Sequence, residues 1–65
     1  MSEAELFVIS QACLRENITL YPNTEFVNTA PGVYEFTNYQ PNRFGFCTPE
    51  RVTAIFKGLQ VRIQR

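Results

Sequence analysis

The sequence predicts a small α+β domain in which an antiparallel sheet of three to four strands carries two helices on one face. Three observations lead to this fold class: a capped apolar segment at the start, short alternating segments between turns, and a second helix signal after Thr48. The chain has 65 residues, of which 45% are hydrophobic and 14% aromatic. This composition indicates one small folded domain over residues 1–65 and not a disordered chain.

The first predicted helix begins at Ser2 and runs to Glu16. Ser2 and Glu5 have the spacing of a capping box, in which each side chain accepts a hydrogen bond from the other residue's backbone N–H. Asn17 tolerates a left-handed backbone and would end the helix. The apolar residues spread almost all round the helical axis, which is typical of a helix buried on several sides. Either a second chain covers one side, or residues 6–9 form a strand instead.

Four strand-like segments follow, separated by turn residues. Residues 18–21 and 25–27 have strand composition on either side of a Tyr-Pro-Asn-Thr turn, and residues 33–37 follow a Pro-Gly turn. Residues 43–47 place two Phe side chains on one side of an alternating segment. We expect the last two segments to form a hairpin with its connection across residues 38–42.

The clearest local signal predicts a second helix beginning at Thr48. Thr is a favoured N-cap, Pro49 suits the first helical position, and Glu50 complements the helix dipole. Apolar residues then recur at i, i+3, i+4 and i+7, which is one face of a helix: Val52, Ile55, Phe56 and Leu59. A last, half-buried strand is expected over residues 59–64, where apolar and polar residues alternate.

The composition excludes most catalytic and metal chemistry. The chain has no His, no Asp and two Cys, so it cannot build a Ser-His-Asp or Cys-His arrangement, a His-ligated zinc site or a four-Cys site. The three Gly residues lie far apart and form no phosphate-binding loop. We therefore expect a protein that is not an enzyme, with no catalytic residue, no metal and no cofactor.

Cys13 and Cys47 are interpreted as free, buried thiols. The first five residues contain two Glu and no Lys or Arg, whereas a secretory signal begins with a basic segment. We therefore expect a cytoplasmic location, where disulfides are rare. No apolar run is long enough to span a membrane, so no membrane association is expected.

Charge is balanced over the whole chain but asymmetric along it. Residues 1–36 carry five Glu and one Arg, a net charge of −4, and residues 37–65 carry five Lys or Arg and one Glu, a net charge of +4. The two halves either interleave in space or form one acidic and one basic face. The sequence is compatible with both arrangements.

These observations predict a non-enzymatic, protein-binding regulatory module. Surface scaling gives roughly 4,200 Å² for a folded chain of this mass, which leaves a marginal core that a homo-oligomer would supplement. The expected self-association residues are Phe7, Val8 and Leu14 of the first helix. Another protein is the expected partner, contacted by residue types that dominate interface hot spots: Tyr21, Tyr39, Arg43, Arg51 and Arg62. Small inhibitors, antirepressors and adaptors of mobile elements act in this way.

An alternative function rests on two short segments. Residues 43–47 (Arg-Phe-Gly-Phe-Cys) resemble the aromatic strand motif of RNA-recognition-motif domains, and residues 6–8 (Leu-Phe-Val) resemble the companion motif on that family's first strand. The resemblance implies a module that binds single-stranded RNA or DNA by stacking bases on Phe7, Phe44 and Phe46. The zero net charge favours protein binding, because phosphate contacts dominate nucleic-acid affinity. In the protein-binding interpretation, Phe44 and Phe46 pack in the core against the second helix.

Overall fold

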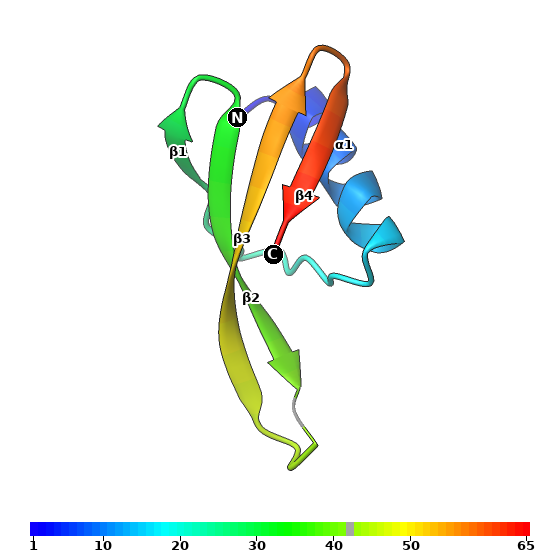
Figure 1. Cartoon of the computed structure of the whole chain (residues 1–65), viewed down its shortest axis with the longest axis vertical. Coiled ribbons are helices and arrows are strands. Elements are labelled where there is room, and N and C mark those ends of the chain that lie inside the picture. Colours follow the sequence, from blue (N-terminus) through cyan, green and yellow to red (C-terminus); the bar gives the residue numbers. More distant parts are fainter. Residues whose placement is uncertain (42) are drawn as a thin grey trace.

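The computed structural model shows one helix and a four-stranded antiparallel sheet, and it describes residues 1–41 and 43–65 (Figure 1). The strands lie in the order β1-β2-β3-β4, so each strand pairs with its neighbour in the sequence. The helix covers one face of the sheet, as the α+β prediction expects. The elements are α1 (Glu3–Arg15), β1 (Val27–Ala30), β2 (Val33–Pro41), β3 (Cys47–Lys57) and β4 (Gln60–Gln64).

The capping box predicted at the start of α1 is confirmed. The Ser2 hydroxyl accepts a hydrogen bond from the Glu5 backbone N–H at 3.2 Å, and a Glu5 carboxylate oxygen accepts one from the Ser2 N–H at 3.2 Å. Asn17 has a φ of 59°, which turns the chain back so that the Ile18 N–H reaches the Cys13 carbonyl at 2.8 Å. Residues 6–9 are therefore helical, and the strand alternative is wrong.

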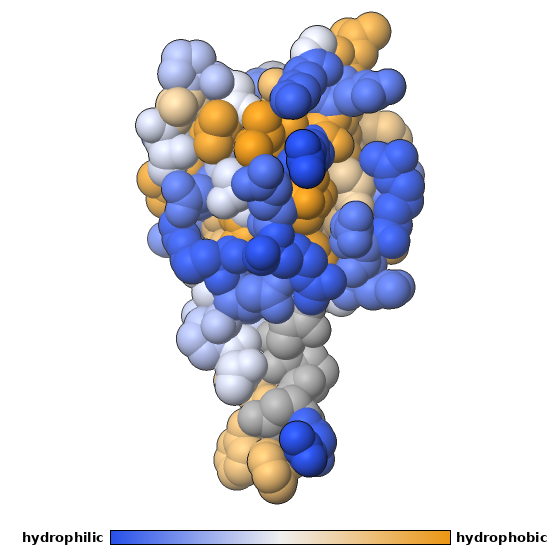
Figure 2. Space-filling model, viewed as in Figure 1, coloured by the Kyte–Doolittle hydropathy of each residue, from blue (hydrophilic) through white to orange (hydrophobic). Residues whose placement is uncertain are grey.

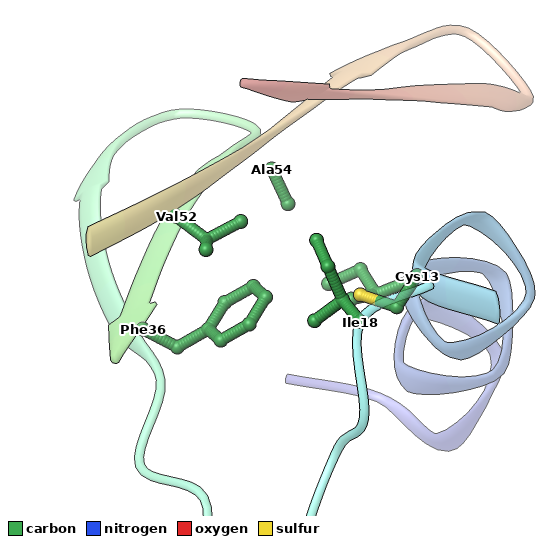
Figure 3. Packing of buried hydrophobic residues seen from close by; sticks show 6 residues of the cluster. Cys13, Ile18, Phe36, Val52 and Ala54 are labelled. Carbon is green, nitrogen blue, oxygen red and sulfur yellow. The ribbon is translucent and has the colours of Figure 1, made fainter. Parts of the chain in front are cut away.

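The core lies between α1 and the covered face of the sheet (Figure 3). Ile9 and Cys13 of the helix belong to one buried cluster with Phe36 of β2, and all three are at most 1% exposed. The Phe36 ring also packs against Phe26, with ring centroids 5.0 Å apart. The buried residues of the cluster are Ile9, Cys13, Ile18, Phe36, Val52 and Ala54.

The second helix predicted after Thr48 is wrong, because the segment from Cys47 to Lys57 is the strand β3. The same residues also alternate, since Val52 and Ala54 are fully buried while Thr53 between them is half-buried and belongs to the other face. A run rich in β-branched residues with nine cross-strand partners in β2 prevails over a local capping signal. Leu59, expected on the apolar helix face, is 97% exposed in the β3–β4 turn.

The other strand predictions are partly correct. Residues 33–37 lie in β2, and the last strand is β4, which follows a turn at Gly58. The segment at residues 18–21 is not a strand, and of residues 25–27 only the last belongs to one. The predicted hairpin exists, but residues 43–46 lie in its connection and not in a strand.

The β2–β3 hairpin extends far beyond the rest of the sheet (Figure 1). β4 pairs with residues 53–57 of β3, and β1 with residues 33–35 of β2, so residues 37–41 and 43–51 project as an arm that contains two strands. The arm makes the molecule 39 Å long but 22 and 20 Å across. Pro49 is tolerated in β3 because the arm strand has a neighbour on one side and needs no N–H donor on the other.

The acidic and basic halves of the chain interleave. Glu35 of β2 belongs to the acidic half and the whole of β3 to the basic half, and Arg51 of β3 forms a salt bridge with Glu35 at 3.0 Å. In the described part of the chain, no helix is long and apolar enough to cross a membrane.

Candidate partner-binding surface

The tip of the arm carries two exposed aromatic rings beside a cation. Phe44 is 74% exposed and Phe46 is 70% exposed, so the prediction that they pack in the core is wrong. The predicted second helix, which would cover them, is instead β3, a strand of the arm. The arm carries both Phe side chains away from the rest of the molecule, which we call the body. Figure 2 shows the result as apolar atoms next to strongly polar ones at the end of the arm.

Local geometry holds this cluster together. The guanidinium carbon of Arg43 lies 5.8 Å from the centre of the Phe44 ring, within the range of a cation–π contact. Gly45 has a φ of 84°, which a residue with a side chain adopts only under strain, so glycine lets the connection turn between the two Phe. We call residues 43–46 the arm tip.

The arrangement differs from the one that the resemblance to RNA-recognition motifs implies. Phe7 lies on α1, whereas Phe44 and Phe46 lie in a hairpin connection. The three rings therefore do not line neighbouring strands of one sheet, which is how that family stacks its bases.

Three of the five predicted partner-binding residues come together at the base of the arm. Tyr21, Tyr39 and Arg51 line a hollow of about 570 Å³, which we call the arm-base hollow. Both Tyr side chains are half exposed. Thr24 fixes the turn that carries Tyr21, because its hydroxyl accepts a hydrogen bond from the Tyr21 N–H at 3.1 Å. Cys47 lines the same hollow, so the hollow extends from the base of the arm towards the arm tip.

Arg51 is already engaged inside the protein. Its guanidinium donates to Glu35 at 3.0 Å and to the Thr37 hydroxyl at 3.2 Å. Its charge is therefore paired with that of Glu35, and its side chain lines the hollow. Arg43 lies apart from it on the tip, and Arg62 lies on β4, away from the arm.

The predicted self-association residues lie on the helix. Phe7 is 64% and Leu14 67% exposed, whereas Val8 is half-buried beside β4. Sequence reasoning missed Leu59, which stands next to Phe7 and Val8 in one hollow. The Lys-Gly pair before Leu59 is the sequence signal for its exposure, because Gly58 has a φ of 62° and begins a hairpin turn.

The two cysteines lie in opposite environments, and the prediction of a buried thiol is wrong for Cys47. Cys13 is buried in the core and Cys47 is exposed on the arm, and both are free thiols. Burial raises the pKa of the Cys13 thiol to about 11.

A polar clamp ties the arm to the end of the helix. The Arg65 guanidinium donates to the Glu50 carboxylate at 2.7 Å and to the Glu16 backbone carbonyl at 3.2 Å. The hydrogen bond from Arg65 lowers the pKa of Glu50 below its ordinary value. The base of the arm is thus held to the body by the last residue of the sequence.

No three His, Cys, Asp or Glu side chains of residues 1–41 and 43–65 gather in a way that could hold a metal ion.

Comparisons with protein-family models, with curated proteins and with solved structures found no match for this chain.

Proposed function

We propose that this chain is a non-enzymatic, protein-binding regulatory module that presents its β2–β3 arm to the surface of another protein. The observation that carries the proposal is the solvent exposure of Phe44 and Phe46 on a projecting arm. Aromatic and Arg side chains supply most of the energy of protein interfaces, and the tip combines both. The arm-base hollow provides a second contact with Tyr21 and Tyr39. Such a module acts by occupying a partner's surface, as inhibitors, antirepressors and adaptors do.

The scarcity of charged residues along the arm favours an apolar binding site on the partner. Between Glu35 and Glu50 the sequence contains one charged residue, Arg43. Burying a Phe side chain contributes about 1.5–3 kcal/mol, so two of them can supply a large part of a micromolar affinity. Arg43, the single cation beside them, would orient the complex by pairing with an acidic residue at the rim of the partner's site.

Photo-crosslinking tests this proposal. A photoreactive phenylalanine analogue at position 44 should trap one specific protein in the native host, and the same analogue at position 57, at the opposite end of β3, should not. The trapped protein, once purified, should bind the double variant F44A/F46A at least about tenfold more weakly than the wild type. Equal trapping from both positions, or an unchanged affinity, would show that the tip is not the binding element.

Single-stranded nucleic acid is the second candidate partner, because exposure of Phe44 and Phe46 is what base stacking requires. Each stacked base contributes about 1–3 kcal/mol. If this candidate is right, the wild type binds oligouridine or oligothymidine with micromolar, salt-sensitive affinity. The folded F44A/F46A variant then loses that binding. Absence of such binding alongside a protein crosslink favours the first candidate.

We also propose that the module self-associates through the outer face of α1. The supporting observations are the exposure of Phe7 and Leu14 and a molecular surface of 4937 Å², against roughly 4,200 Å² expected for this mass. Sedimentation over a range of concentrations should show oligomers for the wild type. Because both residues are exposed, F7E/L14E should give folded monomers, whereas a monomeric wild type would refute the proposal.

A further inference from the structure

A groove runs between α1 and the edge of β4. It consists of two hollows of about 490 and 460 Å³ whose walls share Arg15 and Val61. The helix contributes Val8 and Ala12 to its walls, and the strand contributes Val61 and Ile63. The groove therefore offers apolar side-chain sites along the length of an exposed strand.

The backbone of β4 is open to a further strand. Among the described residues β4 pairs with β3 and with no other strand. Lys57 and Gln60 flank a two-residue turn, where such hairpins place a hydrogen-bonded pair. The alternation of an antiparallel ladder then directs the N–H and C=O groups of Val61 and Ile63 to the outer side. Outward backbone groups of this kind are the template for strand addition.

The opposite edge of the sheet is protected against such pairing. β1 has four residues and a register shift between Asn28 and Ala30. The Asn28 side chain donates to the backbone carbonyls of Ala30 at 2.8 Å and Val33 at 2.9 Å. Irregular, short edges with occupied carbonyls resist strand addition, so of the two outer strands β4 is the open one.

Charge indicates what the groove accepts. Arg15 and Arg62 lie in its walls against one carboxylate, Glu16. Neither guanidinium has a hydrogen-bond or ion-pair partner within the described residues. A second copy of β4 would bring another Arg62 close to Arg62 of the first, which like-charge repulsion disfavours. An acidic strand from another protein would instead place a carboxylate opposite Arg62.

We propose that the groove between α1 and β4 binds an extended peptide of another protein, in which apolar and acidic residues alternate, as a fifth strand of the sheet. The apolar side chains enter the groove beside Val8 and Ala12. The acidic side chains lie on the other face of the strand, opposite Arg62. This surface is separate from the arm tip and does not depend on the function proposed for it.

The probe is a short synthetic peptide that alternates Val and Glu, with a Val–Lys peptide as its counterpart. The Val–Glu peptide should bind saturably and protect the Val61 and Ile63 amides from hydrogen exchange. R62E should weaken Val–Glu binding about three- to tenfold and strengthen Val–Lys binding, because a cross-strand charge pair is reversed. R43E changes the net charge equally at the distant tip and should leave both affinities unchanged.

Several results would overturn the proposal. These are no binding of the Val–Glu peptide up to about 1 mM, equal effects of R62E and R43E, or protection of β1 amides in place of β4 amides. Protection of Val61 and Ile63 that rises with protein concentration, without peptide, would show that a second copy fills the groove. Loss of the arm's partner in F44A/F46A, with peptide binding intact, would separate this surface from the arm.

Discussion

The body and the arm of this molecule place the same residue type in opposite environments. Phe36, on β2 in the body, is 0% exposed and packs on Phe26, while Phe44, eight positions further along, is 74% exposed at the tip. In the body, α1 covers the sheet, so an inward side chain meets the helix. In the arm, two strands pair with each other and project beyond α1, so Tyr39 of β2 is already half exposed. Burial here depends on which part of a strand the helix covers.

The largest test of this contrast is truncation of one Phe in each region. Phe36→Ala should cost about 3–5 kcal/mol of unfolding free energy, because it leaves a cavity in a core with few other large side chains. For 65 residues the total is about 3–10 kcal/mol, so this variant should be largely unfolded. Phe44→Ala should cost less than about 1 kcal/mol, since it removes an exposed ring. Urea unfolding followed by circular dichroism measures both, and comparable losses would contradict the assignment of body and arm.

The same contrast explains how far the sequence predicts the fold. The body was accessible to local reasoning: the Ser2–Glu5 box sets the start of α1, and the alternation after Gly58 indicates β4. The arm was not, because Thr48-Pro49-Glu50 is a strong helix signal and the strand at this site depends on pairing with β2. Pairing with a distant segment overrides local propensity there, and no pattern in the residues next to Thr48 indicates that pairing. The error carried over to Phe44 and Phe46, whose environment depends on that element.

The candidate site was predictable by residue type but not by arrangement. Tyr and Arg preferences alone pointed to Tyr21, Tyr39 and Arg51, and the fold brings these three to one hollow. The same preferences group Arg62 with them, yet it lies on β4. The hydrophobicity of Phe44 indicated burial, and only the length of the hairpin shows that it lies at the tip. Which residues share a surface depends on the register of β2 and β3.

Thiol reactivity is the second test of body against arm. Cys47 is exposed and should react promptly with a thiol reagent in the folded protein. Cys13 is 1% exposed, and burial raises its pKa from 9.0 to about 11. At neutral pH its thiolate is therefore about a hundredfold less populated than that of a thiol with a pKa of 9.0, and it is also shielded from the reagent. One equivalent should react fast and the second only on unfolding, as mass spectrometry of C13A and C47A variants can assign. Fast reaction of both thiols would mean that the core opens readily.

Removal of the arm is a milder perturbation. Residues 39–49 can be replaced by Asn-Gly, a two-residue hairpin turn, between the cross-strand partners Asn38 and Glu50. We expect the unfolding free energy to change by about 1 kcal/mol or less, because the core cluster is untouched and the connection becomes shorter. Thermal unfolding and an amide NMR spectrum that keeps the signals of α1 and β4 would confirm an independent body. A spectrum of an unfolded chain would show that the arm is part of the folding unit.

The smallest expected effect concerns the clamp between the two regions and appears in the pH dependence of stability. The hydrogen bond from Arg65 lowers the pKa of Glu50 below 4.5 in the folded state. A carboxyl group with a lowered pKa stabilises the fold fully above its unfolded value, and that contribution is lost as the pH falls through the folded value. The wild type should therefore lose stability on acidification below 4.5, and Arg65→Gln should lose less while being slightly less stable at neutral pH.

The comparison needs a control because other carboxylates titrate in the same range. The pKa of Glu5 is also lowered, first by the Ser2 backbone N–H and then by the Tyr34 hydroxyl, which donates to it at 3.1 Å. That contribution is present in both proteins and cancels in their difference. Arg15→Gln removes the same charge from a side chain with no ion-pair partner among the described residues, so its stability curve should run parallel to the wild-type curve. If the Arg65→Gln curve converges with the wild-type curve at low pH and the Arg15→Gln curve does not, the effect lies in the clamp. If both variants give curves parallel to the wild-type curve, the Glu50–Arg65 contact contributes nothing to holding the arm against the body.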